Sequence, residues 1–355
     1  MAGSEWFSSR PGGLNRYFES LYSALRDAPG VDVMATAFGA PPPGGASWGP
    51  AALSTPRRVL SSRSRRATPT PDVLDRHFAL YGAHPARRRV AQVEVVHFHG
   101  PWAAESATAG GRRPPVVVKR LIELHRYRAA AHLVVLSDAF RSVLVDDYSI
   151  EPDRITVIPP GVDVSRFRPV SSPRADRPIV LCVRRLERRM GIHRLIQAWA
   201  MIARSFPDAE LHIAGTGTYE PTLREQAAES PSASSIRFVG LLPEGALRSA
   251  YAEATVTVVP SVALEGFGLI ALESLAAGTP PIVTDCGGLP DTVRGLDPSL
   301  VVPADSSADL AERIIDALNG RIPTAAACRS HAELFGWAAV ARRHLDLYTG
   351  LLEAS

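Results

Sequence analysis

The stretch EGFGLIALESLAAGTP, residues 265–280, decides the fold because it joins a glycine turn to a helical pattern. The apolar run VTVVPS (256–261) precedes it, so Glu265 lies at the carboxyl end of a predicted parallel strand. Open α/β sheets bind their ligands at that edge. The helix is predicted to begin near Leu269 and to end with Gly278 as its C′ residue.

The residue types in this stretch favour a bound anion over a plain amphipathic helix. Glycines let the backbone approach a ligand closely, and the start of a helix offers free amides to a diphosphate. Glu273 lies about 7 Å along the axis from Gly268, at ~1.5 Å per residue. A nucleoside diphosphate sugar has this layout. Glu273 would accept from ribose hydroxyls and Glu265 would hydrogen-bond the sugar, with phosphate held by the amides of Gly266, Phe267, Gly268 and Leu269.

Strand-like apolar runs alternate with helical patterns along the chain, which predicts parallel sheets with crossover helices. The fold class expected is α/β, with two doubly wound Rossmann-like domains facing a cleft. The predicted strands are 93–100, 132–137, 155–161, 178–183, 210–215, 236–240, 256–261 and 281–285. The predicted domains are residues 1–168 and 177–334, followed by a C-terminal helix, 335–355, that crosses back. A Pro/Ser/Arg stretch, 166–178, is the predicted linker, and residues 40–56 are predicted to form a loop.

Composition bounds the possibilities. A chain of 355 residues with 46% hydrophobic residues can build two cores. No apolar run approaches the roughly 18–20 residues needed to span a bilayer, and no secretory signal is visible. The three cysteines are far apart and predict neither a disulfide framework nor a zinc site. The location expected is cytoplasmic.

The basic residues gather in two clusters, RRVLSSRSRR (57–66) and ARRR (86–89). They could contact anionic lipid, as in peripheral membrane association, or an acidic acceptor. A solvated surface explains them more simply and is favoured. No aromatic residues are interleaved there, so binding of nucleic acid is not expected.

The string EGFGLIALESLAAGTPPIVTDCGGLPD (265–291) closely resembles the signature of glycosyltransferase family 4, retaining enzymes of the GT-B fold. The likeness covers nearly the whole chain. The other segments that carry it are PGGLNRYFESLYSAL (11–25), HFHGPWAAES (97–106), VIPPGVD (157–163) and FGWAAVARRHLDLY (335–348). The resemblance implies transfer of a sugar from a nucleotide sugar donor to a glycosyl acceptor with retention at the anomeric carbon, and no separate cofactor.

The resemblance also assigns roles to residues outside the signature. Gly12 and Gly13 would line the cleft opposite the donor phosphates. His99 matches the active-site histidine, and Arg185 matches an arginine that neutralises the diphosphate. The catalytic residues implied are therefore Glu265, His99 and Arg185.

A lysine that the family places after this arginine, just before Gly191, is replaced here by Met190. Arg188 or Arg189, one or two positions away, could supply the missing charge, and Arg189 is counted with the donor-binding residues. No Asp-x-Asp triplet occurs in the sequence, which fits a reaction without a metal ion. Same-face attack is expected, because no nucleophile for a double displacement stands out.

Alternatives remain open at this point. The methionine motivates a catalytically silent nucleotide-sugar-binding protein. His97 and His99 could form a metal pair of a metallohydrolase, although the chain does not offer the further ligands in a suitable order. Ser137 could be taken for a nucleophile, but a helix N-cap is favoured. The acceptor could be a lipid, a polysaccharide or a small metabolite.

The first residues predict a defect in the first sheet. The glycine loop of such a domain should follow a central apolar strand, yet only MAGSEWFSSR precedes PGG. We therefore expect an unfilled slot in the sheet and a less stable first domain, with the natural start of the protein lying upstream.

Overall fold

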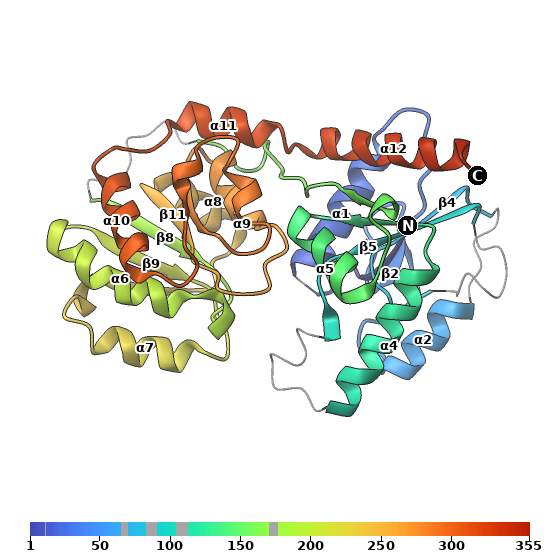
Figure 1. Ribbon diagram of the computed structural model, residues 1–355, viewed down its shortest axis with the longest axis horizontal. Helices are drawn as coiled ribbons and strands as arrows, with labels where there is room; N and C mark the ends of the chain where they lie inside the picture. Colours follow the sequence, from blue (N-terminus) through green and yellow to red (C-terminus); the bar gives the residue numbers. More distant parts are fainter. Residues whose placement is uncertain (11, 65–69, 83–90, 104–112, 170–176) are drawn as a thin grey trace. The chain divides into compact units, whose positions relative to one another are not determined.

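The computed structural model describes residues 1–10, 12–64, 70–82, 91–103, 113–169 and 177–355 (Figure 1). The chain divides into two compact units. The N-terminal unit comprises Met1–Gly161 together with Trp337–Ser355, and the C-terminal unit comprises Val162–Gly336. The division falls between Gly161 and Val162, before the predicted linker, much of which lies outside the described residues.

The N-terminal unit is built on a seven-stranded parallel sheet with the order β3-β2-β1-β4-β5-β6-β7. Its strands are β1 (Ala2–Glu5), β2 (Thr36–Phe38), β3 (Ala46–Ser47), β4 (Val73–Arg76), β5 (Val93–Phe98), β6 (His132–Val135) and β7 (Ile155–Val157). Its helices include α1 (Gly13–Arg26), α2 (Thr55–Ser64), α4 (Arg113–Ala129), α5 (Asp138–Tyr148) and α12 (Trp337–Glu353).

Helices cover both faces of this sheet, because side chains alternate between the faces of a strand. In β5, Val93 and Val95 share a core with α1 and α12. Val96 and Phe98, on the opposite face, share a core with α4 and α5. Burial on both faces explains why β5 reads as a nearly continuous apolar run.

The C-terminal unit has a six-stranded parallel sheet with the order β10-β9-β8-β11-β12-β13. Its strands are β8 (Ile179–Val183), β9 (Glu210–Ala214), β10 (Ile236–Gly240), β11 (Val256–Val259), β12 (Pro281–Thr284) and β13 (Val301–Val302). Its α-helices include α6 (Ile192–Ser205), α7 (Glu220–Ala228), α8 (Glu244–Glu253), α9 (Leu269–Ala276), α10 (Ser307–Leu318) and α11 (Ala325–Glu333). All eight strands predicted from apolar runs are confirmed, most of them shorter by one to four residues at their ends.

The expected defect in the first sheet is wrong. Ala2–Glu5 forms β1, which is buried and pairs with both β2 and β4. Small residues replace the expected apolar ones because α1 packs closely: a Cβ on Gly3 would lie 2.7 Å from the Phe18 ring. Glu5 is tolerated because Arg58 pairs with its carboxylate at 2.7 Å. The expectation of a weakened first domain therefore loses its basis.

The same ion pair corrects the interpretation of the first basic cluster. Arg58 is buried at 8% exposure, so this residue is part of the interior and not of a solvated surface. The second cluster, 86–89, lies outside the described residues. The predicted loop 40–56 is only partly a loop, since it contains β3 and the first residues of α2.

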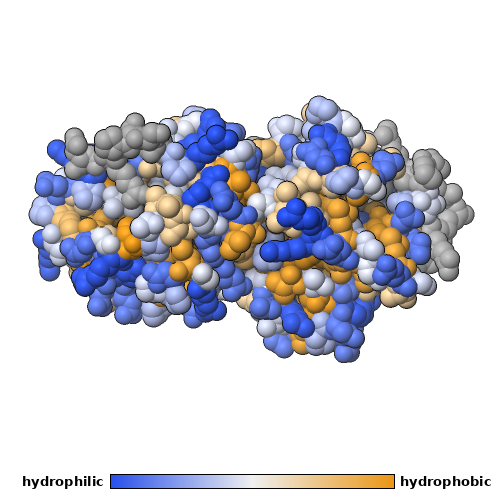
Figure 2. Space-filling model, turned by 90° about the horizontal axis from the view of Figure 1, so that it is seen from above, coloured by the Kyte–Doolittle hydropathy of each residue, from blue (hydrophilic) through white to orange (hydrophobic). Residues whose placement is uncertain are grey.

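The surface and the cysteines agree with the composition. On the face shown in Figure 2, hydrophilic and hydrophobic side chains are interspersed over both units. Cys182, Cys286 and Cys328 are all buried. Within the described ranges, no helix combines the length and the apolar character required to cross a bilayer.

Candidate functional site

The ends of two central strands bring the candidate donor residues of the C-terminal unit together. β8 and β11 are neighbours although two other strands separate them in sequence, so the strand order reverses at this pair. Ligands of open α/β sheets bind outside the carboxyl ends of the strands at such a switch point. Arg184 follows β8 directly, and the loop that carries Ser261 and Glu265 follows β11.

A buried ion pair joins these two strand ends. Nη2 of Arg184 donates to Oε2 of Glu265 and to Oγ of Ser261. Ser261 in turn donates to the same carboxylate oxygen over 3.1 Å. The side chains of Arg184 and Glu265 are 6% and 14% exposed. Charge-assisted hydrogen bonds of this kind hold a carboxylate in one position.

The other arginines of this segment lie differently. Arg185, the arginine that matches the family pattern, is exposed, and so is Arg188. Arg189 donates through Nη1 to the carbonyl of Leu264 at 2.9 Å. The family pattern indicates Arg185 and not its neighbour Arg184. Side chains of neighbouring residues at the end of a strand point in opposite directions, so Arg184 is buried while Arg185 is exposed.

Met190, where a lysine was expected, is 4% exposed, and its Sδ lies 2.9 Å from Nη2 of Arg184. The side chain of residue 190 therefore contacts Arg184, which is neither of the two arginines proposed from the sequence.

The loop before α9 is held by the glycines that follow β12. Leu264 has a φ of 53°, which is rare for a residue with a side chain. The carbonyl of Glu265 accepts from the amide of Gly288 at 3.1 Å. Gly287 has a φ of 56°, and a Cβ there would lie 1.9 Å from the same carbonyl oxygen. The position of Glu265 thus depends on two glycines more than twenty residues away in sequence.

The next residues fill the interior and start the helix. Phe267 is 2% exposed and its ring packs 5.9 Å from that of Phe335, so only its backbone can serve a ligand. Gly266 is half-buried and Gly268 is the N-cap residue of α9, which begins at Leu269. Their amides lie at the start of this helix, as the sequence predicts.

Helix α9 ends as expected. Gly278 has a φ of 78° and donates to Leu275, while Thr279 donates to Ser274, both over 2.9 Å. This pair of hydrogen bonds is the Schellman motif, which confirms Gly278 as the C′ residue.

Glu273 lies within α9 and is 7% exposed. Its Oε2 accepts a 3.0 Å hydrogen bond from the hydroxyl of Tyr251 on α8. Tyr251 is completely buried, so this contact fixes the carboxylate from the core side.

In the N-terminal unit, β1 and β4 form the corresponding switch point. Gly12 is the N-cap residue of α1 and Gly13 its first residue; both are exposed with open space around them.

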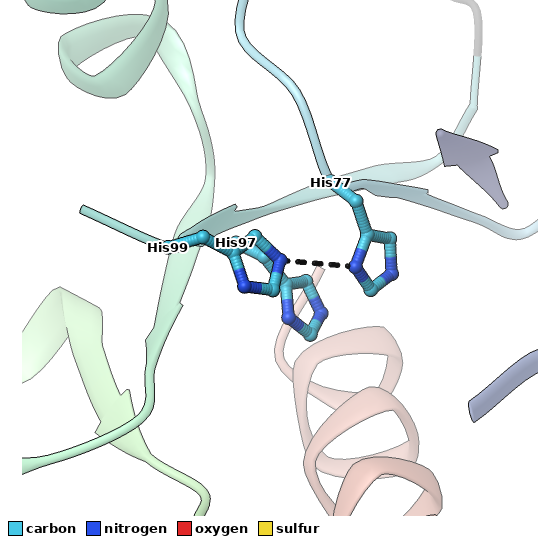
Figure 3. A group of neighbouring side chains, drawn as sticks. All are labelled: His77, His97 and His99. Atoms are coloured by element: carbon cyan, nitrogen blue, oxygen red, sulfur yellow. Dashed lines mark hydrogen bonds between the residues drawn. The ribbon is translucent and has the colours of Figure 1, made fainter. Parts of the chain in front are cut away.

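His99 follows β5, and Nε2 of its ring lies 3.2 Å from Nδ1 of His77, which follows β4 (Figure 3). The sequence did not single out His77, because a lone histidine between arginine and phenylalanine belongs to no pattern.

One weaker sequence candidate, Ser137, and one glycine loop have structural explanations. Ser137 caps α5, with Oγ accepting from the amide of Phe140 at 3.3 Å, which confirms the N-cap interpretation. The glycines of AGTG (214–217) let this loop pack on the chain after β8, since a Cβ on Gly215 would lie 1.9 Å from the carbonyl of Arg184.

Two family models match the chain. The model described as Glycosyltransferase Family 4 matches residues 11–166, and the model described as Glycosyl transferases group 1 matches residues 163–335. The D-inositol 3-phosphate glycosyltransferase of Thermomonospora curvata is 32% identical over 310 residues, which is 79% of this chain and 71% of that protein. The chain belongs to glycosyltransferase family 4.

A second relative of this glycosyltransferase bears the same name, D-inositol 3-phosphate glycosyltransferase, in Corynebacterium kroppenstedtii. It is 32% identical over 281 residues, which is 73% of this chain. The chain spans 62% of the length of that relative.

Solved structures share the fold of the glycosyltransferase. Sucrose-phosphate synthase from Thermosynechococcus elongatus has a TM-score of 0.82 at 24% identity, covering 100% of this chain and 99% of that one. Anabaena HepE, in complex with UDP and glucose, has a TM-score of 0.76 at 16% identity, covering 98% and 99%. The predicted GT-B fold class is confirmed by these likenesses and by the two parallel sheets flanked by helices.

Proposed function

We propose that this glycosyltransferase moves a sugar from a nucleoside diphosphate sugar to an acceptor hydroxyl, with retention and without a metal ion. The observation that carries the proposal is the Arg184–Glu265 ion pair, set at the switch point of the C-terminal sheet beside the start of α9. A cation, an oriented carboxylate and free helix amides are the groups that a sugar diphosphate needs.

The donor would extend along α9. Its diphosphate would accept from the amides of Gly266 to Leu269, where the positive end of the helix dipole stabilises negative charge. Glu273, oriented by Tyr251, would accept from the ribose hydroxyls. Both hydrogen bonds that the Glu265 carboxylate accepts end on Oε2, so among the described residues Oε1 is left to accept from a sugar hydroxyl.

Arg184 would neutralise the leaving group in place of the lysine that is absent at Met190. Nε of Arg184 is buried and has no hydrogen-bond partner among the described residues. A buried donor without an acceptor is costly, and a phosphate oxygen would satisfy it. Negative charge builds on the β-phosphate as the sugar departs, so a fixed cation there lowers the barrier. Arg185, which is exposed, would approach the same diphosphate from solvent.

In the proposed reaction the bond between the anomeric carbon and the diphosphate oxygen breaks first. The acceptor oxygen forms the new bond on the same face, and its proton passes to the departing phosphate. No side-chain nucleophile is required. In the N-terminal unit, the amides of Gly12 and Gly13 and the ring of His99 would contact the reacting sugar and acceptor, with His99 accepting from a sugar hydroxyl.

The acceptor is proposed to be a phosphorylated polyol, because the relatives carry the name D-inositol 3-phosphate glycosyltransferase. A test would offer D-inositol 3-phosphate and unphosphorylated inositol with a panel of nucleotide sugars. Transfer to the phosphorylated compound alone is expected. Transfer to neither, with transfer to a lipid or polysaccharide, would overturn this part of the proposal and leave the donor site intact.

The donor site is tested by thermal shift with UDP and UDP-glucose, since binding to the folded state raises its melting temperature. Glu265→Gln should abolish most transfer but keep UDP binding, whereas Glu312→Gln, at an exposed position of α10, should change neither. Excess EDTA should leave transfer unchanged. UDP binding without any transfer would favour a silent binding protein, and activity lost with EDTA and restored by Mn²⁺ would contradict the metal-free mechanism.

A further inference from the structure

Three histidines meet at the carboxyl ends of β4 and β5 in the N-terminal unit (Figure 3). The two strands pair in parallel, with Arg76 opposite Val96. His77 follows β4, His97 lies within β5, and His99 follows β5. The dashed contact in Figure 3 joins Nδ1 of His77 to Nε2 of His99 over 3.2 Å.

The other ring nitrogen of His77 contacts a buried carboxylate. Nε2 of His77 lies 3.0 Å from Oδ2 of Asp75, two residues earlier on the same face of the chain. Asp75 and His77 are 2% and 1% exposed, whereas His99 is partly exposed. The three side chains form a line of hydrogen bonds from the interior to the end of the strand.

The direction of the hydrogen bonds along this line follows from the chemistry of the Asp75 carboxylate at its buried end. An ionised carboxylate only accepts hydrogen bonds, so Nε2 of His77 carries a proton. A neutral His77 then presents Nδ1 as an acceptor, and His99 must donate to it through its Nε2–H. The remaining nitrogen of His99, Nδ1, is left as the acceptor.

We propose that Asp75 and His77 are positioning residues that hold His99 as its Nε2–H tautomer, with Nδ1 turned into an acceptor for a substrate hydroxyl. The inference rests on the proposed function, in which His99 contacts the sugar or the acceptor. A second imidazole between the carboxylate and the reacting histidine extends the logic of a catalytic triad by one residue.

Burial and charge around the cluster support two of the protonation states that this requires, the ionised Asp75 and the neutral His99. Burial acts to raise the pKa of Asp75, but the nearby rings of His97 and His77 hold that pKa well below its usual range. Burial, together with His77 and His97, keeps the pKa of His99 well below its ordinary value, so the ring is neutral near pH 7.

His97 and the helices complete the surroundings of the line. Nε2 of His97 lies 2.9 Å from Oδ1 of Asp75, and its ring stacks on that of His77 at 4.0 Å. On the helix side, Tyr17 of α1 and His344 of α12 pack against the cluster, each with its ring less than 6 Å from that of His97. The rings of Tyr17 and Phe18 also pack against that of His77, at 5.7 and 5.1 Å, which leaves the His77 ring few alternative orientations.

The three rings could be taken for a metal site, since their nitrogens lie within 4.8 Å of one another. The lone pair of a ring nitrogen lies in the plane of the ring, so the planes of ligating histidines must intersect at the ion. His77 and His97 are instead stacked at an interplanar angle of 21°, and His97 and His99 at 16°. The ring geometry therefore favours the hydrogen-bonded line over a shared ion.

The decisive experiment is a double-mutant cycle. His77→Phe keeps a stacking ring but removes the hydrogen bonds of His77 to Asp75 and His99. It should lower kcat by about 10- to 100-fold because the His99 ring is then misoriented. The KM for the donor should stay the same. In a His99→Ala background, His77→Phe should have no further effect, since coupled residues are not additive. Asp75→Asn should behave like His77→Phe. His132→Gln, at a buried histidine of β6 that contacts Thr156, is the matched control and should leave kcat unchanged.

A spectroscopic readout covers the case in which the variants fold poorly. Nitrogen NMR of the wild-type rings should show His99 protonated at Nε2 and not at Nδ1. A protonated Nδ1, equal losses from His77→Phe in both backgrounds, or one Zn²⁺ retained per chain after desalting and lost in His77→Phe would each overturn the proposal. Failure of the whole proposed function would differ, because the wild-type chain itself would then transfer no sugar.

Discussion

Nη2 of Arg184 lies 2.9 Å from Sδ of Met190, at the end of a buried methionine side chain. The guanidinium also contacts Glu265. A lysine at position 190 is one atom longer than methionine, so its ammonium would compete for the space that the guanidinium occupies. The absent lysine at position 190 and the buried Arg184 are therefore parts of one arrangement.

Moving the cation from position 184 to position 190 tests this arrangement. Arg184→Ala should lower kcat by about 100- to 1,000-fold, as expected when a group that stabilises developing charge is lost. It should also lower the melting temperature, because a buried carboxylate left unpaired costs ~3–5 kcal/mol. Adding Met190→Lys to Arg184→Ala should recover at least part of both, since an ammonium then enters the vacated space.

Met190→Lys alone is the matched control for this exchange. It would place two cations beside one carboxylate, so it should lower the melting temperature without raising kcat. Turnover measured with a saturating nucleotide sugar, together with thermal melts, gives both quantities. A double variant that regains neither stability nor activity would contradict the shared arrangement of residues 184 and 190.

Glu273 and Tyr251 make a second prediction. Glu273→Ala should weaken UDP binding by about 1–3 kcal/mol, because ribose hydroxyls lose their acceptor. Tyr251→Phe removes only the hydroxyl that donates to Glu273, so its effect should have the same direction and be smaller. Isothermal titration of both variants with UDP provides the comparison, and an unchanged affinity in Glu273→Ala would refute the ribose assignment.

Much of the fold could be predicted because parallel strands buried on both faces require continuous apolar residues. β5, β8, β11 and β12 show this directly, and the helix that follows β11 carries its own glycine cap. β1 and β4 could not be recognised in this way. Their charged residues are neutralised by partners distant in sequence, Glu5 by Arg58 and Arg76 by Glu94.

The candidate site also contains residues that a sequence motif can indicate and residues that it cannot. The proposed donor-binding residues Glu265, Glu273 and the loop amides lie in one short stretch of sequence, so a motif can indicate them. Arg184 and His77 are defined by what they touch across strand ends, and no spacing along the chain records those contacts. A position-by-position comparison notes the missing lysine but not the guanidinium of Arg184, six residues earlier in the chain, which contacts Met190.

Gly287 provides a third prediction, on the loop that holds Glu265. Gly287→Ala would force a side chain into a positive φ and place its Cβ 1.9 Å from the Glu265 carbonyl oxygen. Gly240→Ala is the matched control, since Gly240 has a similar φ of 71° but no atom within 4 Å of the added Cβ. Both should lose about 1–2 kcal/mol of stability from the strained backbone.

Only Gly287→Ala should also lower kcat, because displacement of the carbonyl moves the Glu265 carboxylate. Melting temperatures and turnover of the two variants separate strain from displacement. Equal turnover in both would mean that the glycine loop after β12 does not control the position of Glu265.

The last prediction concerns acid sensitivity of the N-terminal unit. His344 on α12 is completely buried, with Nδ1 donating to the carbonyl of Val340 at 2.8 Å and Nε2 3.3 Å from the hydroxyl of Tyr17. Both contacts suit the neutral ring. Burial, with a smaller contribution from His97, lowers the pKa of His344 from 6.5 to about 4.

Because the folded-state pKa lies below the unfolded one, the unfolded chain takes up a proton first as the pH falls. The stabilisation is complete above pH 6.5 and is lost progressively down to about pH 4, at about 1.4 kcal/mol per pH unit. Burial lowers the pKa of His99 as well, which adds to the loss in the same direction. Calorimetric melting temperatures should therefore fall steeply between pH 7.5 and 5.

His344→Gln should flatten this dependence, since glutamine does not titrate. His212→Gln, at a partly exposed histidine of β9 that contacts Glu210, is the matched control and should keep the wild-type slope. If His344→Gln melts with the same dependence on pH as the wild type, then the pKa of His344 changes little when the chain folds, and protonation of this buried ring is not the cause of the acid sensitivity.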